Sequence, residues 1–202
     1  RGSAEAASRR ALTGWIFPPP AGTPRIVTTI IGPTLPEPYF GTVESVWDEL
    51  VAEFGIDRYV NPFPHFTLYA LEGEVDVPAV EAAVESATEE YGPLSLHTDG
   101  IGVFPGNHVW IPVAKSPELA ALHADVVDAV EGLGPPPVPF YEPRRWFPHV
   151  GVALSVGDEQ AGDIVEFLLD DDFEWDFTVD NVTITQPPAD GAEHEVVGSV
   201  DL

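Results

Sequence analysis

One sequence pattern occurs twice in this chain, 84 residues apart, and it sets the strongest limit on the fold. Residues 63–71 and residues 147–154 share a Phe-Pro-His start and an apolar continuation. Each copy predicts a strand entered through a proline, and each is followed by an acidic loop and an amphipathic helix. A duplicated strand–helix unit favours two similar lobes related by an approximate two-fold axis. We therefore expect two equivalent histidines, His65 and His149, on either side of one shared cleft.

Hydrophobic periodicity predicts further elements around the two copies. The clearest helix spans 42–54, because its apolar residues recur at helical spacing and Gly55 follows as a C-terminal stop. A second helix begins at Ser116, a capping serine followed by a proline at the first helical position. The remaining predictions are strands at 26–31, 93–104, 108–114, 173–186 and 194–202, and helices at 78–90 and 159–170.

The first 24 residues differ in composition from the rest of the chain. They are rich in Ala, Ser, Gly and Pro, which predicts a flexible arm at 1–24 before one folded unit at 25–202. No apolar run approaches the roughly 20 residues that span a bilayer, and no basic-then-apolar signal pattern begins the chain. These observations predict a cytoplasmic protein that makes no membrane contact.

The net charge of the chain limits the classes of partner that it can bind. The chain has 34 acidic and 8 basic residues, which give a formal net charge of −26. This balance argues against gripping duplex DNA or an anionic membrane by bulk electrostatics, since such binding neutralises phosphates with Lys and Arg. The absence of cysteine excludes disulfides, thiolate metal sites and a cysteine nucleophile. Carboxylates spread along a chain with one lysine favour a salt-loving cytoplasm, where the Debye length at 1 M salt is about 3 Å; ordinary acidic solubility is the alternative.

The repeated histidines carry the candidate chemistry. Strand side chains alternate between two faces, so His65 shares a face with Thr67 and Tyr69, while His149 shares one with Gly151. Histidine titrates nearest neutrality of all side chains. Two imidazoles that face one cleft can divide acid–base work, one removing a proton from an attacking hydroxyl or water and the other protonating the leaving oxygen.

The two motifs resemble the paired His-x-Thr/Ser-x motifs of the two-histidine phosphoesterases, and they look most like the 2′-5′ RNA ligase-like branch, which includes RNA 2′,3′-cyclic phosphodiesterases. The resemblance covers residues 25–202 in element order, including Val109-Trp110-Ile111-Pro112-Val113 before the serine-capped helix. It implies an α+β fold of duplicated βαβ-type halves, bilobal, with antiparallel sheets around a central groove. It also implies hydrolysis or transfer at a 2′,3′-cyclic phosphate or a 2′-5′ phosphodiester with no metal and no cofactor. Under this resemblance His65 and His149 are acid and base, and Thr67 binds phosphate.

The chain departs from the family pattern at one position. Gly151 stands where the family has Thr or Ser, so one phosphate-binding hydroxyl is missing, although glycine lets a backbone N–H approach a phosphate closely. Arg144 and Arg145 lie five and four positions before His149 and form a candidate anion site; pairing with surface carboxylates is the alternative. Neighbours in an extended segment point opposite ways, so we expect one of the two to contact substrate. Tyr141 is the preferred candidate for stacking on a base, with core packing as its alternative.

Other interpretations stay open at this point. Histidines in strands are often structural, and a histidine metal pair is possible, although no third ligand with recognisable spacing accompanies the two. His123 lies on a buried helical stripe and is expected to be structural, and His97, His108 and His194 have no supporting pattern. The rival functions are a non-catalytic nucleotide- or RNA-binding protein, a phosphoesterase or lyase for another cyclic phosphate such as an ADP-ribose product, and a purely structural protein. The expected partner is an RNA terminus or a small nucleotide, and a monomer is favoured.

Overall fold

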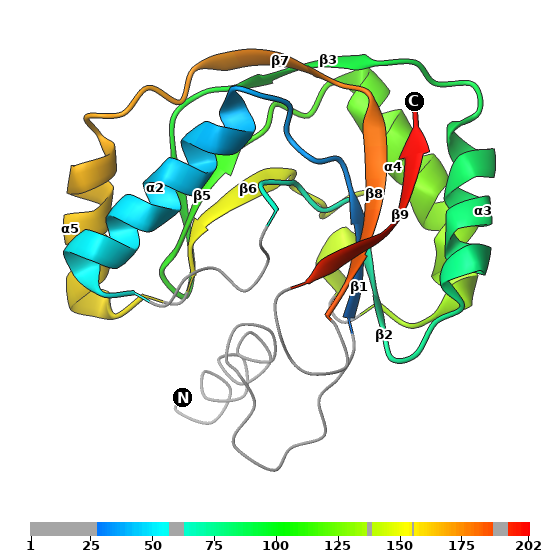
Figure 1. Ribbon diagram of the computed structural model, residues 1–202, viewed down its shortest axis with the longest axis horizontal. Helices are drawn as coiled ribbons and strands as arrows, with labels where there is room; N and C mark the ends of the chain where they lie inside the picture. Colours follow the sequence, from blue (N-terminus) through cyan, green and yellow to red (C-terminus); the bar gives the residue numbers. More distant parts are fainter. Residues whose placement is uncertain (1–27, 57–62, 137–138, 155, 188–193) are drawn as a thin grey trace.

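The computed structural model describes residues 28–56, 63–136, 139–154, 156–187 and 194–202 (Figure 1). The arm predicted at 1–24 lies outside these residues. The helices and strands in chain order are β1 (Thr28–Gly32), α2 (Tyr39–Phe54), β2 (Tyr69–Glu72), α3 (Val77–Thr88), β3 (Leu94–Thr98), β4 (Gly102–Phe104), β5 (His108–Pro112), α4 (Pro117–Val130), β6 (His149–Ala153), α5 (Asp158–Leu168), β7 (Trp175–Val179), β8 (Asn181–Gln186) and β9 (Glu195–Asp201). Two short 3₁₀ turns, Glu131–Leu133 and Pro139–Tyr141, lie between α4 and β6.

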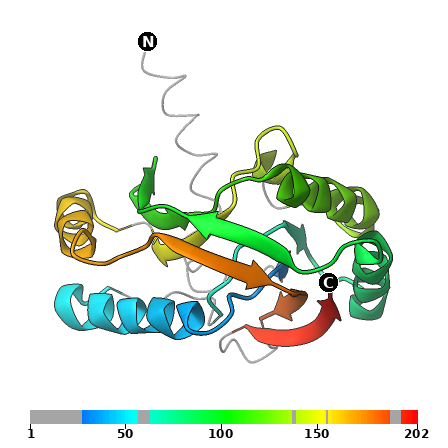
Figure 2. The same cartoon turned by 90° about the horizontal axis from the view of Figure 1, so that it is seen from above.

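Two halves of the chain have the same order of elements. β1-α2-β2-α3-β3-β4 is followed by β5-α4-β6-α5-β7-β8, and each half lends its last strand to the sheet of the other. One sheet has the order β2-β1-β8-β9, the other has the order β4-β5-β6, and every pairing is antiparallel. β3 pairs with β7 and joins the two lobes across the top of the molecule (Figures 1 and 2). The predicted α+β fold of duplicated halves with antiparallel sheets is therefore confirmed.

The helices cross between the halves in the same way. α2 packs with α5 and contacts β6, so it covers the sheet of the second half, whereas α4 packs with α3 and contacts β2 in the sheet of the first half. Figure 1 shows α2 and α5 on one side of the molecule and α3 and α4 on the other. Each crossing helix buries one stripe of residues at helical spacing. The buried residues are Val43, Val46, Trp47 and Leu50 in α2, and Leu119, Leu122, His123, Val126, Val127 and Val130 in α4.

Several predicted elements differ from the structure. The strand predicted through residues 63–71 is regular only over β2, because His65 and Phe66 form isolated bridges and the chain bends at Leu68. The single strands expected at 93–104 and 173–186 are each two strands, because the first part of each joins the β3–β7 ribbon and the second part enters a lobe sheet. Gly100, at φ +71°, allows the first of these changes of direction. The helix expected at 42–54 begins earlier, at Tyr39. Asp99 and Gly100 interrupt the first run, and Asp180 and Asn181 interrupt the second, so both breaks carry turn-forming residues inside the expected single strands.

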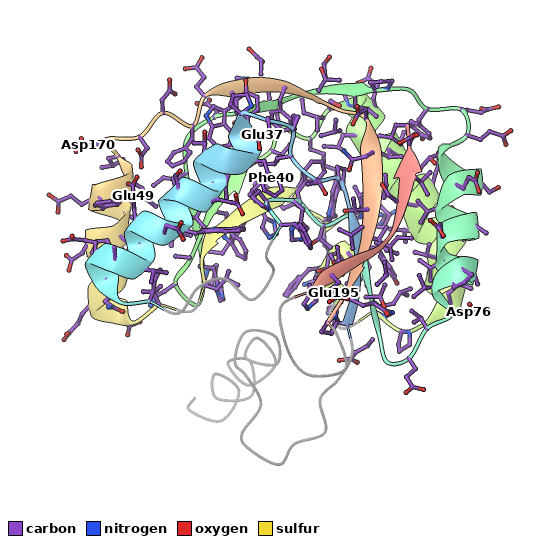
Figure 3. The ribbon with its side chains drawn as sticks, viewed as in Figure 1. Glu37, Phe40, Glu49, Asp76, Asp170 and Glu195 are labelled. Atoms are coloured by element: carbon purple, nitrogen blue, oxygen red, sulfur yellow. The ribbon has the colours of Figure 1, made fainter. Side chains whose placement is uncertain are left out.

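Acidic side chains lie on the outer surface of both lobes. Glu49 on α2, Asp76 before α3 and Asp170 after α5 are exposed and lie at the outside of the molecule (Figure 3). Within the described ranges, no helix has the length and apolar character needed to cross a membrane.

Candidate functional site

The two Phe-Pro-His motifs meet side by side at the junction of the lobes. Phe66 forms an antiparallel bridge with Val150, so in that register His65 lies opposite Gly151 and Thr67 lies opposite His149. Side chains alternate between faces, which places these four positions on one face of the pair. Phe66 and Val150 lie on the other face and are buried in the core. The two histidines are therefore diagonal neighbours, whose backbone positions are about 7–8 Å apart in such a pair.

Each motif is held against its own sheet by an equivalent backbone bond. The amide of Leu35, just after β1, donates to the Pro64 carbonyl at 2.8 Å, and the amide of Val113, just after β5, donates to the Pro148 carbonyl at 3.0 Å. Proline at these positions fixes φ and favours an extended residue before it. The Phe-Pro-His sequence therefore enters its strand in the same way in both lobes.

Both imidazoles are oriented by the same local bond. Nδ1 of His65 donates to the Phe63 carbonyl at 2.6 Å, and Nδ1 of His149 donates to the Phe147 carbonyl at 2.7 Å. A carbonyl oxygen only accepts, so Nδ1 carries the proton in each neutral ring and Nε2 is the nitrogen left for chemistry. The Thr67 hydroxyl lies 3.3 Å from Nε2 of His65, so it shares the reactive side of that ring.

The pKa values of both histidines are lowered. Burial lowers the pKa of His65 below 6.5, and the hydrogen bond to Phe63 offsets part of this effect. Burial lowers the pKa of His149 to about 4 against the opposing hydrogen bond to Phe147, with smaller contributions from the charges of His65 and His108. Trp110 packs edge-to-face on the His149 ring, with centroids 4.0 Å apart, and supplies much of the apolar surroundings.

The lowered pKa of His149 predicts a measurable titration. In the ligand-free protein, the Cε1 proton of His149 is expected to titrate with a midpoint near 4 rather than 6.5 in an NMR pH series. Between these values the unfolded chain binds more protons than the folded one, so the contribution of His149 to the free energy of unfolding decreases as the pH falls through that window. Added inorganic phosphate should raise the midpoint, since a nearby anion favours the protonated ring. A midpoint at or above 6.5 without phosphate contradicts this description of the site.

The other predicted site residues lie on the loop that leads into the second motif. Arg144 and Arg145 are exposed, and the guanidinium of Arg145 lies over the Phe140 ring at 4.9 Å. Lys115 donates to the carbonyls of Pro143 and Trp146 in the same loop, at 2.9 and 3.3 Å. Within the part of the chain that the structure describes, these three are all of the Lys and Arg side chains. The described cations therefore gather beside one motif.

Tyr141 and Tyr69 pack on each other. Tyr141 is half-buried and packs on Tyr69 with ring centroids 5.7 Å apart, so at least part of its ring is used internally. Tyr69 itself is 3% exposed, because the strand bends at Leu68 and the alternation that begins at His65 ends there. Tyr69 therefore belongs to the core rather than to the face of the histidines.

Sequence reasoning missed the neighbours of His149. His108, which had no supporting pattern, is buried, packs on Trp110 at 5.4 Å and is close enough to affect the pKa of His149. The alternation of side chains along β5 could have shown that His108 and Trp110 share one face of the strand. Only the pairing of β5 with β6 shows that this face lies beside His149. Among the described residues, no group of three His, Asp or Glu side chains is arranged to hold a metal ion.

The family model described as the 2′-5′ RNA ligase superfamily matches residues 36–190, a range that contains both histidine motifs. The chain belongs to the 2′-5′ RNA ligase superfamily. No curated protein sequence matches the chain significantly.

Several solved structures share the fold of this chain. TT0787 of Thermus thermophilus is similar with a TM-score of 0.63 and 15% identity, over 87% of this chain and 97% of that one. Escherichia coli LigT in its apo form gives a TM-score of 0.61 and 16% identity, over 88% and 98% of the two chains. LigT complexed with 3′-AMP gives a TM-score of 0.58 and 16% identity, over 88% and 99%. At these identities the likeness establishes the fold.

Proposed function

We propose that this protein is a metal-independent phosphoesterase that acts on RNA 2′,3′-cyclic phosphate ends or 2′-5′ phosphodiester linkages by two-histidine acid–base catalysis. One observation carries the proposal: the Phe66–Val150 bridge puts His65, Thr67, His149 and Gly151 on one face, with the two imidazoles diagonal to each other. Two imidazoles that are diagonal neighbours on one face can both reach a phosphate placed over that face, each through a hydrogen bond of about 2.8 Å. The two Nε2 atoms could therefore serve opposite sides of one phosphorus centre.

The proposed hydrolysis needs one neutral and one protonated ring. The neutral imidazole takes a proton from water as the water oxygen forms a bond to phosphorus. The protonated imidazole gives its proton to the ribose 3′ oxygen as the bond between that oxygen and phosphorus breaks, which leaves a 2′-phosphate. Both pKa values are lowered in the free protein, so the anionic substrate itself would raise the pKa of one ring and charge it. Which ring is acid and which is base depends on the direction of the reaction.

The proposed substrate contacts lie around this pair. Thr67 holds a phosphate oxygen, and the backbone at Gly151 takes the equivalent place in the other motif. Arg144 or Arg145 contributes a cation, and the half-buried ring of Tyr141 contributes a stacking surface for a base. LigT has been solved with 3′-AMP, with ATP and with NADP+, which supports a nucleotide as the class of ligand in this chain.

We also propose that the protein acts in concentrated salt, because its surface is strongly acidic. A net charge of −26 repels RNA over long distances in dilute buffer. Screening at high ionic strength shortens this repulsion to a few ångströms, so that the local cations near Arg144 decide the approach of an RNA end.

The direct test is incubation with 2′,3′-cyclic nucleotides in concentrated KCl with EDTA. We expect release of the nucleoside 2′-phosphate, with EDTA causing no loss of rate. Turnover that requires added zinc would contradict the metal-independent mechanism. Binding of the cyclic nucleotide without any product would favour the non-catalytic rival, and competition by a non-RNA cyclic phosphate at lower concentration would assign the activity to that substrate.

The missing hydroxyl at Gly151 gives a second prediction. Gly151→Ser is expected to raise kcat for the cyclic nucleotide about 10-fold or more, because a hydrogen bond to a charged group contributes about 1.5–3 kcal/mol. Thr67→Ala should lower kcat by a similar factor, and Thr67→Ser should retain it. A folded Gly151→Ser variant with unchanged or lower kcat would show that the backbone already fills this role. That result would remove Gly151 as the weak point of the site.

A further inference from the structure

Two buried tryptophans bind the backbone of the motifs at equivalent places. The indole N–H of Trp146 donates to the Thr67 carbonyl at 2.8 Å, and the indole N–H of Trp47 donates to the Gly151 carbonyl at 3.1 Å. Thr67 and Gly151 are the third residues of the two His-x-Thr/Gly motifs. The tryptophan side chains are 3% exposed at Trp47 and 5% exposed at Trp146. Each indole therefore makes its bond inside the core, where an unpaired carbonyl is costly.

The two indoles reach these carbonyls by different routes. Trp47 lies on α2, which contacts the strand of the second motif, and His123 lies on α4, which contacts the sheet of the first. An imidazole is shorter than an indole, and in the α4 lobe Trp146 makes the bond instead, stacked on His123 with ring centroids 3.8 Å apart and planes 8° apart. Burial lowers the pKa of His123 to about 4, which keeps the ring neutral as a stacking surface at neutral pH. A pair of aromatic residues in one lobe thus does what a single tryptophan does in the other.

These bonds lie where strand pairing is irregular. Thr67 and Leu68 fall between the bridged residue Phe66 and the start of β2, in a bend of the chain. Gly151 pairs with Trp110 at the position where the β5–β6 register shifts. Regular ladders hold strand carbonyls in place, and an irregularity leaves that task to side chains. The indole N–H groups supply fixed hydrogen-bond donors to the carbonyls of Thr67 and Gly151, each two residues after a motif histidine.

Trp146 connects the two motifs, because it is close to one in sequence and hydrogen-bonded to the other. It lies three residues before His149, and its indole holds the carbonyl two residues after His65. Lys115 fixes the same loop through the carbonyls of Pro143 and Trp146 and lies 5.2 Å from the centroid of the Trp146 ring. A change in the Trp146 bond therefore moves one motif relative to the other, rather than both together.

We propose that Trp146 and Trp47 are positioning residues that hold the two motif strands against each other and so set the separation of the His65 and His149 rings. This inference rests on the proposed function where it concerns rate, and on geometry alone where it concerns the placement of the rings. Misplacement of reacting groups by about 1 Å can cost about 100-fold in rate. Two bonds remote from the substrate are therefore expected to affect turnover.

The test removes each N–H while keeping an aromatic ring. Trp146→Phe and Trp47→Phe are expected to lower kcat for the cyclic nucleotide about 10–100-fold, with KM changed by no more than about twofold. The matched control is Trp175→Phe. Its indole, in a side chain 7% exposed, donates to the Asp172 carbonyl at 2.8 Å, in β7 and away from the motifs. Trp175→Phe should lower the melting temperature to a similar extent and leave kcat unchanged.

A second readout separates this inference from the proposed function. In ¹H–¹⁵N spectra recorded without substrate, Trp146→Phe should shift the imidazole signals of both His65 and His149, and Trp175→Phe should shift neither. A His123→Phe variant tests the stacking of His123 on Trp146. It keeps an aromatic ring against Trp146 and should therefore retain kcat. Unmoved imidazole signals in a folded Trp146→Phe variant would overturn the inference, whether or not the protein turns over a cyclic phosphate. Equal losses of kcat in Trp146→Phe and Trp175→Phe would also overturn it, since stability alone would then explain both.

Discussion

Replacing either motif histidine by alanine is expected to lower kcat for a 2′,3′-cyclic nucleotide about 10²–10⁴-fold, because each removes one partner of a general acid–base pair. The loss should fall on kcat more than on KM, since the proton transfers occur only in the transition state. The double variant His65→Ala/His149→Ala should be little slower than the slower single variant, because the two rings act as a unit. Steady-state kinetics in concentrated KCl with EDTA measures all three.

His97→Ala is the control for these variants. His97 is a histidine on β3 whose ring pairs with Asp176 on β7 at 3.0 Å, with 41% of its side chain exposed. It lies outside both motifs, and its replacement should leave kcat unchanged. If His65→Ala or His149→Ala retained full activity, the two-histidine mechanism would be wrong. A change in nucleotide affinity alone, in a protein with no turnover, would leave the binding-protein rival in its place.

The largest effect on stability is expected at Gly32, where β1 passes the first motif. A Cβ at this position would collide with the carbonyl oxygen of Phe66 and press on the backbone of Thr67. Both neighbours are backbone atoms that cannot rotate away, so Gly32→Ala must shift the motif strand. We expect the free energy of unfolding to fall by about 1–3 kcal/mol. Because the strand that moves carries His65, kcat should fall about 100-fold as well.

Chemical denaturation measures the change in the free energy of unfolding, and steady-state kinetics on the same preparation measures the change in kcat. Gly162→Ala is the matched control, because Gly162 lies within α5 and a Cβ there meets no atom within 4 Å. That variant should be more stable by about 1 kcal/mol, as expected for alanine in a helix, with unchanged kcat. A Gly32→Ala protein as stable and active as the wild type would mean that β1 does not hold the motif in the way described.

The repeat predicted much of the fold because it is a local signal that occurs twice. Alternation along residues 63–71 correctly placed Phe66 and Leu68 in the core, and both are fully buried. The exchange of β4 and β8 between the lobes could not be predicted in this way, since strand partners far apart in the chain leave no periodicity. The breaks at Gly100 and Asp180 did have a local signal, since Asp99-Gly100 and Asp180-Asn181 are turn-forming pairs. That the strands on either side of each break join different sheets had no such signal.

Part of the candidate site could be predicted from the sequence and part could not. The alternation within each motif put His65 with Thr67 and His149 with Gly151, and the antiparallel bridge at Phe66 brings those two faces together. Trp47, Trp146 and His108 could not be assigned from the sequence, because a tryptophan or histidine on an apolar face is predicted as core. Their contacts with the motifs depend on which helix crosses to which sheet, which is a property of the whole chain.

The central claim is that one phosphate lies between two imidazoles, and a crystal structure of the protein with bound 3′-AMP or inorganic phosphate tests it most directly. We predict Nε2 of His65 and Nε2 of His149 each within hydrogen-bond distance of oxygens on the same phosphorus atom, with Thr67 on a further oxygen. A phosphate bound to only one of the rings, or bound away from both, would contradict it.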